Sequence, residues 1–389
     1  MAVKDMDMFE QARAGRQLTA TQAADLALEL FVVGYEGDAL PDDYADMLRR
    51  GLTGAILFRR NIHYDGAGTA DIEHLCAQTA QIHAAGARQP CGLPVVCSVD
   101  QEGGAVARLK APFSVWPPMR RLGERADVAL VHAVGRQLGR ELLAAGFNVD
   151  YAPVLDVDTN PANPIIGDRA FSRDPEEVAR LAAALLKGLQ SEGVLGCGKH
   201  FPGHGDTDVD SHLDLPTLPH DLARLRAVEL VPFAKLASDL HLVMTAHVLF
   251  PAIDPMWPAT LAPQILGPLL RVECGYRGVI VSDDLEMQGI AKVLDSGACV
   301  RRGLAAGVDL FLVCRRRDTL QGAWDAAAEV LAGAPGEPLV ARALDAISRN
   351  RAMRRQLTHC TPRADALRAV LGDAETQRLR AQVWAGTLA

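Results

Sequence analysis

The 389-residue sequence has no long hydrophobic run and no block of basic residues, and only 5% of its residues are aromatic. A membrane-spanning helix needs about 20 consecutive apolar residues, so none is expected. The net charge of −8 at pH 7 and the lack of a basic stripe argue against nucleic acid as a partner. Residues 1–17 lack the apolar stretch of a signal peptide, which favours a cytoplasmic protein.

The eight cysteines include no CxxC pair and show no spacing typical of a disulfide framework. Several lie in apolar runs, where a reduced thiol behaves as a small hydrophobic side chain. Apolar residues make up 49% of the chain, which is enough for one large core. A parallel α/β barrel of roughly this length often forms a single domain.

Short apolar runs alternate along the chain with longer stretches of helical periodicity. We expect eight strands, at residues 30–35, 54–58, 94–99, 149–156, 195–198, 241–246, 278–282 and 308–314. Strands separated by helices indicate a parallel sheet, and their lack of polar alternation indicates that both faces are covered. Because no GxGxxG motif follows an early strand, we favour a closed (β/α)₈ TIM-type barrel of the α/β class over a doubly wound sheet.

The barrel is expected to occupy residues 30–333 as a single domain with flanking helices. Residues 1–29 are predicted to form a helical lead-in, and the Arg-rich residues 334–389 a helical extension packed outside the barrel. Within the barrel, helices are expected over 126–145, 175–191, 222–238 and 260–272.

Polar residues gather where the predicted strands end, which is where barrel enzymes place their active sites. They are Asp100 and Glu102 after the third strand, Asp156 and Asp158 after the fourth, Lys199 and His200 after the fifth, His247 after the sixth, and Asp283 and Asp284 after the seventh, with Arg169 in the loop after the fourth. One charged residue at a strand end is usually a solvated cap. Five strand ends together favour an active site.

The densest cluster is the segment KHFPGHGDTDVDSH at residues 199–212. It lies in a connection of about 20 residues, where two to six are usual, and such long loops often carry function. His200, His204 and His212, with the neighbouring aspartates, suit either a metal site or acid/base chemistry, and their spacing leaves both open. We interpret His204 as a structural residue of the loop.

Two adjacent carboxylates, Asp283 and Asp284, end the seventh predicted strand. Alternate residues of a barrel strand face inward, so the two side chains are expected to point in different directions. One should reach the central pocket. The other is expected to cap the next helix or to bond to nearby backbone.

Six segments resemble the single-barrel bacterial β-N-acetylglucosaminidases of glycoside hydrolase family 3. They are ILFRRN (56–61), DQEGG (100–104), APVLDV (152–157), GKHFPGHG (198–205), DSH (210–212) and SDDLEM (282–287). The resemblance implies that Asp283 is the nucleophile and His212 the acid/base group, with Asp210 holding the imidazole of His212. Histidine suits this role because it titrates near neutral pH.

The resemblance also implies a set of residues that bind the sugar hydroxyls. They are Asp100, Arg108, Arg169, Lys199 and His200. The family commonly has an arginine directly after DQEGG, where this chain has Ala105, so Arg108 is matched to the second basic position of that pattern.

The activity implied is a retaining exo-β-N-acetylglucosaminidase that acts through a glycosyl-aspartate, without metal or cofactor. The implied substrate is a small carbohydrate, a muropeptide fragment in cell-wall recycling or a chitooligosaccharide, and the enzyme is expected to be a monomer. Three alternatives remain: a metal-dependent barrel hydrolase, a sugar-binding barrel without activity, and a related glycosidase or phosphorylase of different sugar preference.

Overall fold

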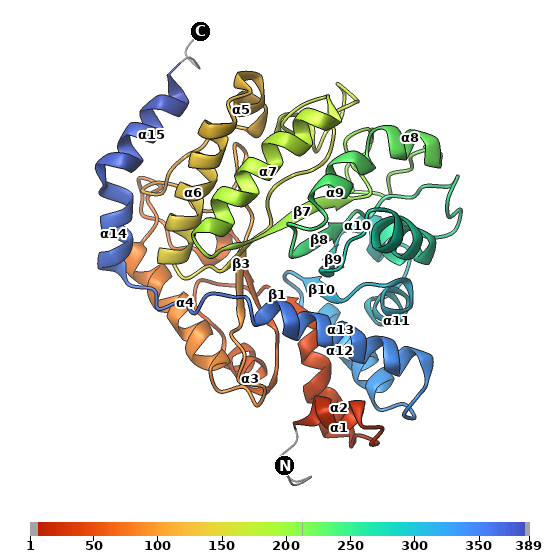
Figure 1. The fold of residues 1–389 in the computed structure, drawn as a ribbon. Helices are drawn as coiled ribbons and strands as arrows, with labels where there is room; N and C mark the ends of the chain where they lie inside the picture. Colours follow the sequence, from red (N-terminus) through yellow and green to blue (C-terminus); the bar gives the residue numbers. More distant parts are fainter. Residues whose placement is uncertain (1–6, 212, 386–389) are drawn as a thin grey trace.

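The computed structural model describes residues 7–211 and 213–385, which contain a closed barrel of eight parallel strands (Figure 1). The strands are β1 (Phe31–Val33), β2 (Gly54–Leu57), β3 (Val96–Val99), β6 (Val149–Asp150), β7 (Leu195–Phe201), β8 (Leu242–Thr245), β9 (Val279–Asp284) and β10 (Leu310–Val313). They pair in chain order, and β10 closes the barrel against β1. Each predicted strand overlaps one of them, so the (β/α)₈ prediction is confirmed.

A ring of helices surrounds the barrel, and a short hairpin, β4 (Gln101–Gly103) with β5 (Val106–Ala107), follows β3. The α-helices are α1 (Met8–Arg13), α2 (Ala20–Ala27), α3 (Asp42–Arg50), α4 (Ile72–Gly86), α5 (Met119–Arg125), α6 (Val128–Ala144), α7 (Pro175–Ser191), α8 (Leu222–Ala227), α9 (Leu230–Leu236), α10 (Gln288–Ala291), α11 (Ser296–Ala306), α12 (Arg317–Leu331), α13 (Pro338–Arg354), α14 (Ala364–Gly372) and α15 (Ala374–Trp384). Of the helices described, none is long and apolar enough to cross a membrane.

Helix α7 shows how local sequence sets these boundaries. Asp174 caps its first turn by accepting a hydrogen bond from the backbone N–H of Glu176 at 2.9 Å. Pro175 occupies the first helical position, where its missing N–H is not needed, and Glu176 and Glu177 complement the helix dipole. The helix spans the residues expected from periodicity and packs against α6.

The segment 222–238 was expected to be one helix and is two, α8 and α9. Pro232 lies in the first turn of α9. Its ring nitrogen has no hydrogen to donate to the carbonyl of Val228, which favours a break in the helix at this point. Between β8 and β9, the expected helix is a π-helix, Ile265–Glu273, with Pro268 inside it.

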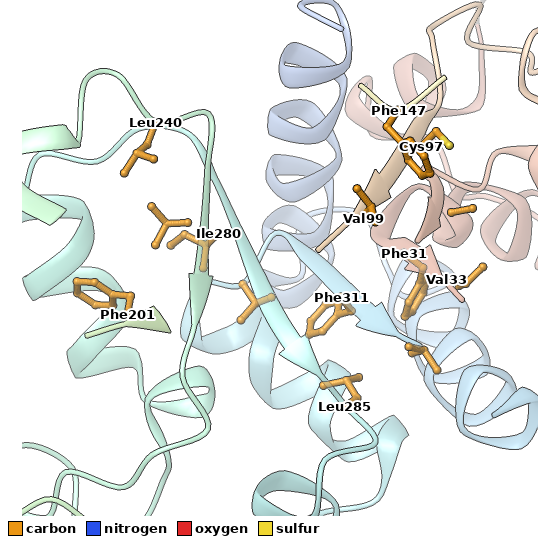
Figure 2. Close-up of a cluster of buried hydrophobic side chains, with 14 of the residues drawn as sticks. Phe31, Val33, Cys97, Val99, Phe147, Phe201, Leu240, Ile280, Leu285 and Phe311 are labelled. Carbon is orange, nitrogen blue, oxygen red and sulfur yellow. The ribbon is translucent and has the colours of Figure 1, made fainter. Parts of the chain in front are cut away.

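Apolar side chains form two layers, one inside the barrel and one between the strands and the helices. Along β1, Val32 faces the interior, whereas Phe31 and Val33 face the outer layer (Figure 2). The rings of Phe31 and Phe311 lie with their centroids 6.0 Å apart in that outer layer. This alternation decides which polar side chains can reach the central pocket, except where a strand changes register.

The two ends of the chain pack on the barrel in different ways. Residues 7–29 contain the α-helices α1 and α2, and the chain turns between them at Gly15, which has a φ of 77°. Helices α14 and α15 lie against α6 (Figure 1). Helix α13 does more than pack outside, because Met353 and Leu357 at its carboxyl end join the apolar cluster inside the barrel.

Candidate active site

A pocket of about 150 Å³ opens where the strands end. Six of the eight residues expected at the site line it: Asp100, Arg108, Arg169, Lys199, His200 and Asp283. They come from β7, β9, the segment after β3 and the loop after β6, which are far apart in sequence. The closed barrel is what brings them together.

Lys199 is the centre of the charged side of this pocket. Its Nζ lies 2.8 Å from a carboxylate oxygen of Asp100 and 2.6 Å from one of Glu102, and the side chain is almost fully buried. Arg169 binds Glu102 with two hydrogen bonds of 2.8 Å each. Burial opposes the charge on Glu102, but Arg169 and Lys199 outweigh it and hold its pKa below the ordinary value. The four groups therefore form an ionised network that presents oriented donors and acceptors.

Glu102 belongs to the DQEGG segment, but no role had been predicted for it. Its side chain is 2% exposed and holds both Arg169 and Lys199 in place. The sequence signal that pointed to Glu102 was its position after a predicted strand. That signal could not separate a residue that touches substrate from one that orients its neighbours.

Arg108 lies at the edge of the pocket, with its guanidinium 3.6 Å from Asp100. The guanidinium also sits over the ring of Phe58, 5.5 Å from its centroid. The Nε atom of Arg108 is buried without a hydrogen-bond partner among the described residues. A substrate oxygen would satisfy this donor.

His200 and His204 have different surroundings, although both line the pocket. Nδ1 of His200 lies 2.7 Å from Asp156, so Nε2 is the nitrogen that can contact a substrate. Both ring nitrogens of His204 are engaged, Nδ1 at 2.8 Å from Thr207 and Nε2 at 2.9 Å from Ser211. Burial, followed by the neighbouring His200, lowers the pKa of His204 to about 4. His204 is therefore neutral and holds the loop in place, which agrees with its interpretation from the sequence as a structural residue.

Both Asp283 and Asp284 line the pocket, although alternation predicted opposite directions. The pairing of β9 with β10 explains this, because it changes register between Leu310 and Leu312 and leaves one extra residue on β9. Asp284 also bonds to backbone, as expected for one of the pair. It accepts hydrogen bonds from the N–H groups of Glu286 at 3.1 Å and Cys314 at 3.2 Å.

The environment of Asp284 is unfavourable to a negative charge. Burial raises its pKa to about 7, and the nearby Glu286 and Asp283 add to the effect. The side chain of His247 supports the same turn, because its Nε2 lies 3.1 Å from the carbonyl oxygen of Asp284. Burial therefore favours the protonated form of Asp284, whereas a nucleophile acts as the ionised carboxylate.

The loop between β7 and α8 carries the remaining expected residues. His212 lies outside the described residues. Asp210 is half-buried and does not line the pocket, but its carbonyl accepts hydrogen bonds from the N–H groups of Leu213 and Asp214. Ser211 does line the pocket, so this loop reaches the site.

Within residues 7–211 and 213–385, no group of three His, Cys, Asp or Glu side chains is arranged to hold a metal ion. The histidines of the loop have other partners in this part of the chain. His200 pairs with Asp156, and His204 bonds to Thr207 and Ser211.

A closed parallel barrel with an ionised pocket at its carboxyl end defines the class of (β/α)₈ enzymes. Residues 15–345 match the family described as "Glycosyl hydrolase family 3 N terminal domain". The chain therefore belongs to glycosyl hydrolase family 3 and is a glycoside hydrolase, as the resemblance implied.

Relatives and solved structures agree with this assignment. The β-hexosaminidase of Chromobacterium violaceum is 41% identical over 82% of this chain and 86% of its own length. A family 3 β-N-acetylglucosaminidase from Paenibacillus superposes with a TM-score of 0.82 at 34% identity, covering 92% of this chain and 68% of that one. NagZ from Neisseria gonorrhoeae, in complex with N-trifluoroacetyl-D-glucosamine, superposes with a TM-score of 0.72 at 33% identity, covering 92% and 97%.

Proposed function

We propose that the protein is a retaining exo-β-N-acetylglucosaminidase that removes a terminal β-linked N-acetylglucosamine residue. The observation that carries this proposal is the pocket itself, in which Asp283 and the ionised network of Asp100 and Lys199 line one small cavity. A cavity of this size suits a single terminal sugar. The names of the relatives and the ligand of the Neisseria structure support N-acetylglucosamine as that sugar.

In the proposed mechanism, Asp100, Arg108, Arg169, Lys199 and His200 hold the sugar hydroxyls. Asp283 attacks the anomeric carbon while His212 protonates the leaving oxygen, so that the glycosidic bond breaks and a glycosyl-aspartate forms. His212 then accepts a proton from water, whose oxygen displaces the carboxylate of Asp283. Asp210 stabilises the imidazolium form of His212, which gives up its proton in the first step and is restored in the second.

Trapping the covalent intermediate tests this mechanism directly. A slow 2-deoxy-2-fluoro glycosyl donor, followed by peptide mapping, is expected to label Asp283. Asp284→Asn should still be labelled, whereas Asp283→Ala should not. A label on Asp284 in the unchanged enzyme would contradict the assignment of the nucleophile.

Two simple assays address the alternative reactions. An aryl β-N-acetylglucosaminide should be cleaved equally well with a chelator and with added divalent metal, whereas a metal-dependent hydrolase would be inhibited by the chelator. The released sugar should be N-acetylglucosamine with and without phosphate in the buffer. A sugar phosphate as the main product would instead identify a phosphorylase.

We further propose that the natural leaving group carries carboxylates, as a muropeptide fragment of cell-wall recycling does. Residues beside the pocket lining support this, because Arg59 follows Phe58 and the hydroxyl of Tyr64 donates to the carbonyl of Arg108. Arg59 stacks on Tyr64 at 5.3 Å, and the N–H of Lys110 donates to the Tyr64 hydroxyl at 3.4 Å. Among the described residues, the side chains of Arg59 and Lys110 have no carboxylate partner.

A comparison of two substrates tests the proposal that the leaving group carries carboxylates. Replacing Arg59 and Lys110 with alanine should lower kcat/KM for a muropeptide and leave kcat/KM for chitobiose unchanged within about twofold. Added salt should weaken the difference, because exposed charges are screened. Equal effects on both substrates would speak against an anionic leaving group.

A further inference from the structure

The loop between β7 and α8 rests on the short helix that follows the proposed nucleophile. Three residues separate this helix, α10, from the end of β9. The backbone N–H of Gly289 in α10 donates a hydrogen bond of 3.0 Å to the carbonyl of Ser211. The backbone next to position 212 is therefore held by the helix that follows the strand carrying Asp283.

Glycine is the only residue type that permits this contact at position 289. A Cβ atom at position 289 would lie 2.9 Å from the carbonyl oxygen of Ser211 and 3.1 Å from that of Asp214. Both are backbone atoms and cannot rotate away as a side chain could. Any larger residue would push the loop off α10.

Lys292 holds the other side of position 212. Its Nζ donates to the carbonyl of Leu213 at 2.9 Å and lies 3.2 Å from a carboxylate oxygen of Asp214. The backbone N–H of Leu215 and then Lys292 lower the pKa of Asp214, so this carboxylate stays charged near neutral pH. The contact is exposed to solvent, so we expect it to be weaker than the Gly289 contact.

His204 fixes the same loop from the barrel side. Its Nε2 lies 2.9 Å from the hydroxyl of Ser211, and the ring is buried. The carbonyl of His204 also accepts a hydrogen bond from Asn163 at 2.9 Å, which ties the loop to the segment after β6. The residues on both sides of position 212 are thus held by His204, Gly289 and Lys292.

We infer that Gly289 and Lys292, together with His204, are positioning residues for the acid/base step, because they latch the loop that carries His212 onto the turn after Asp283. The inference rests on the proposed function. A retaining glycosidase needs a fixed distance between nucleophile and proton donor. Here the short stretch of backbone after β9 would set the positions of both the nucleophile and the proton donor.

The test uses Gly289→Ala and Lys292→Met in the full chain, with two substrates that differ in leaving group. For an alkyl β-N-acetylglucosaminide, which needs a proton on its leaving oxygen, kcat/KM should fall by roughly 10- to 100-fold in Gly289→Ala. For the 4-nitrophenyl glycoside, which needs little protonation, it should fall less than about threefold. Lys292→Met should show the same pattern with a smaller effect.

Azide gives a second readout that a loss of stability would not produce. With the 4-nitrophenyl substrate, the glycosyl-aspartate should accumulate in Gly289→Ala, and both kcat and KM should fall. Azide needs no base to attack the anomeric carbon. It should displace the carboxylate of Asp283, release a glycosyl azide and raise kcat.

Two matched variants control for the substitutions themselves. Gly267→Ala adds the same methyl group at a glycine where a Cβ would meet nothing within 4 Å. Lys235→Met removes a lysine that is 50% exposed, against 52% for Lys292, and that also pairs with one carboxylate. Both controls should behave as the unchanged enzyme with both substrates.

His212→Ala, measured in parallel, separates the inference from the proposed function. Suppose that the loss of kcat/KM in His212→Ala depends on the leaving group, whereas the loss in Gly289→Ala and Lys292→Met does not, and azide has no effect on these two variants. The positioning role of Gly289 and Lys292 is then wrong, and the acid/base assignment of His212 stands. If His212→Ala loses activity equally on both substrates, the acid/base assignment fails and the latch fails with it. Should Gly289→Ala not fold, the exposed Lys292→Met decides the question.

Discussion

The two ends of the barrel contain the same kinds of buried charged residues but arrange them differently. At the carboxyl end, Lys199, Glu102 and Arg169 form ion pairs beside an open pocket. At the amino end, Arg351 and Glu29 form an equally buried pair, with the Arg351 side chain 7% exposed. A buried ion pair is therefore not by itself a sign of a functional site.

What separates the network of Lys199, Glu102 and Arg169 from the Arg351–Glu29 pair is the open space beside its charges. At the amino end, Met353 and Leu357 fill the mouth of the barrel, and the Arg354 side chain is fully buried against backbone carbonyls of the segment before β3. Asp309 is likewise matched by Arg271 at 2.5 Å. Glu29 and Asp309 thus each have arginine partners, and we interpret these buried pairs as contributions to stability. At the carboxyl end, the pocket leaves room for a substrate to complete the network.

The largest expected effect is at the carboxyl end. Asp283→Asn should lower kcat by at least about 10⁴-fold, because the amide cannot form the covalent intermediate. The unfolding free energy should change by less than about 1 kcal/mol, since the substitution keeps the shape of the side chain. Turnover of an aryl N-acetylglucosaminide and a urea titration measure the two quantities. An inactive Asp284→Asn beside an active Asp283→Asn would move the nucleophile by one residue.

The matching change at the amino end should have the opposite profile. Arg351→Met leaves Glu29 buried without its closest partner, which is 2.7 Å away, and should lower the unfolding free energy by about 3–5 kcal/mol. In the fraction that remains folded, kcat should stay within about twofold. The double variant with Glu29→Gln should recover part of the stability, because the side chain at position 29 then carries no buried charge. A loss of kcat as large as the loss of stability would undermine the contrast between the ends.

The barrel could be predicted from sequence because its strands are continuous apolar runs bounded by helices. The outward side chains Phe31 and Val33 and the inward Val32 obey the simple period of a strand. The break between α8 and α9 could not be predicted from periodicity alone, because it depends on where Pro232 falls in the helix.

The site was predicted less completely than the fold. Charged residues at strand ends pointed to Asp100, Lys199 and Asp283, which all line the pocket. Glu102 was missed because its role is to orient its neighbours, and such a role depends on distances that a sequence does not carry. The same holds for the register change in β9, which brings Asp284 to the pocket beside Asp283. It depends on pairing with β10 and not on the residues of β9 alone.

Asp284 should also make the stability of the protein depend on pH. The pKa of Asp284 is about 7 in the folded protein and about 4 in an unfolded chain, so the folded state binds more protons between these values. The stability that protonated Asp284 provides is complete below about pH 4 and is lost as the pH rises through 7. Asp284→Asn does not titrate. Relative to that of the unchanged protein, the unfolding free energy of Asp284→Asn should therefore rise by roughly 3 kcal/mol between pH 4 and pH 8.

Denaturant titrations of both proteins across this pH range measure that difference. Other groups, such as His204 and Glu102, titrate in both proteins and cancel in the comparison. A constant difference across the range would mean that Asp284 is ionised throughout. In that case, two charged neighbours would share the floor of the pocket.

The smallest effect is expected at the rim, where the chain departs from the family pattern. Ala105 is exposed at the turn between β4 and β5, and Arg108 already makes the contact with Asp100. Ala105→Arg should therefore change the unfolding free energy by less than about 0.5 kcal/mol and kcat/KM by less than about threefold. A drop in KM of tenfold or more would show that the arginine at 105 reaches the sugar. The open side of the pocket would then be an incomplete part of the site and not merely its entrance, and the contrast with the buried Arg351–Glu29 pair would extend to the rim.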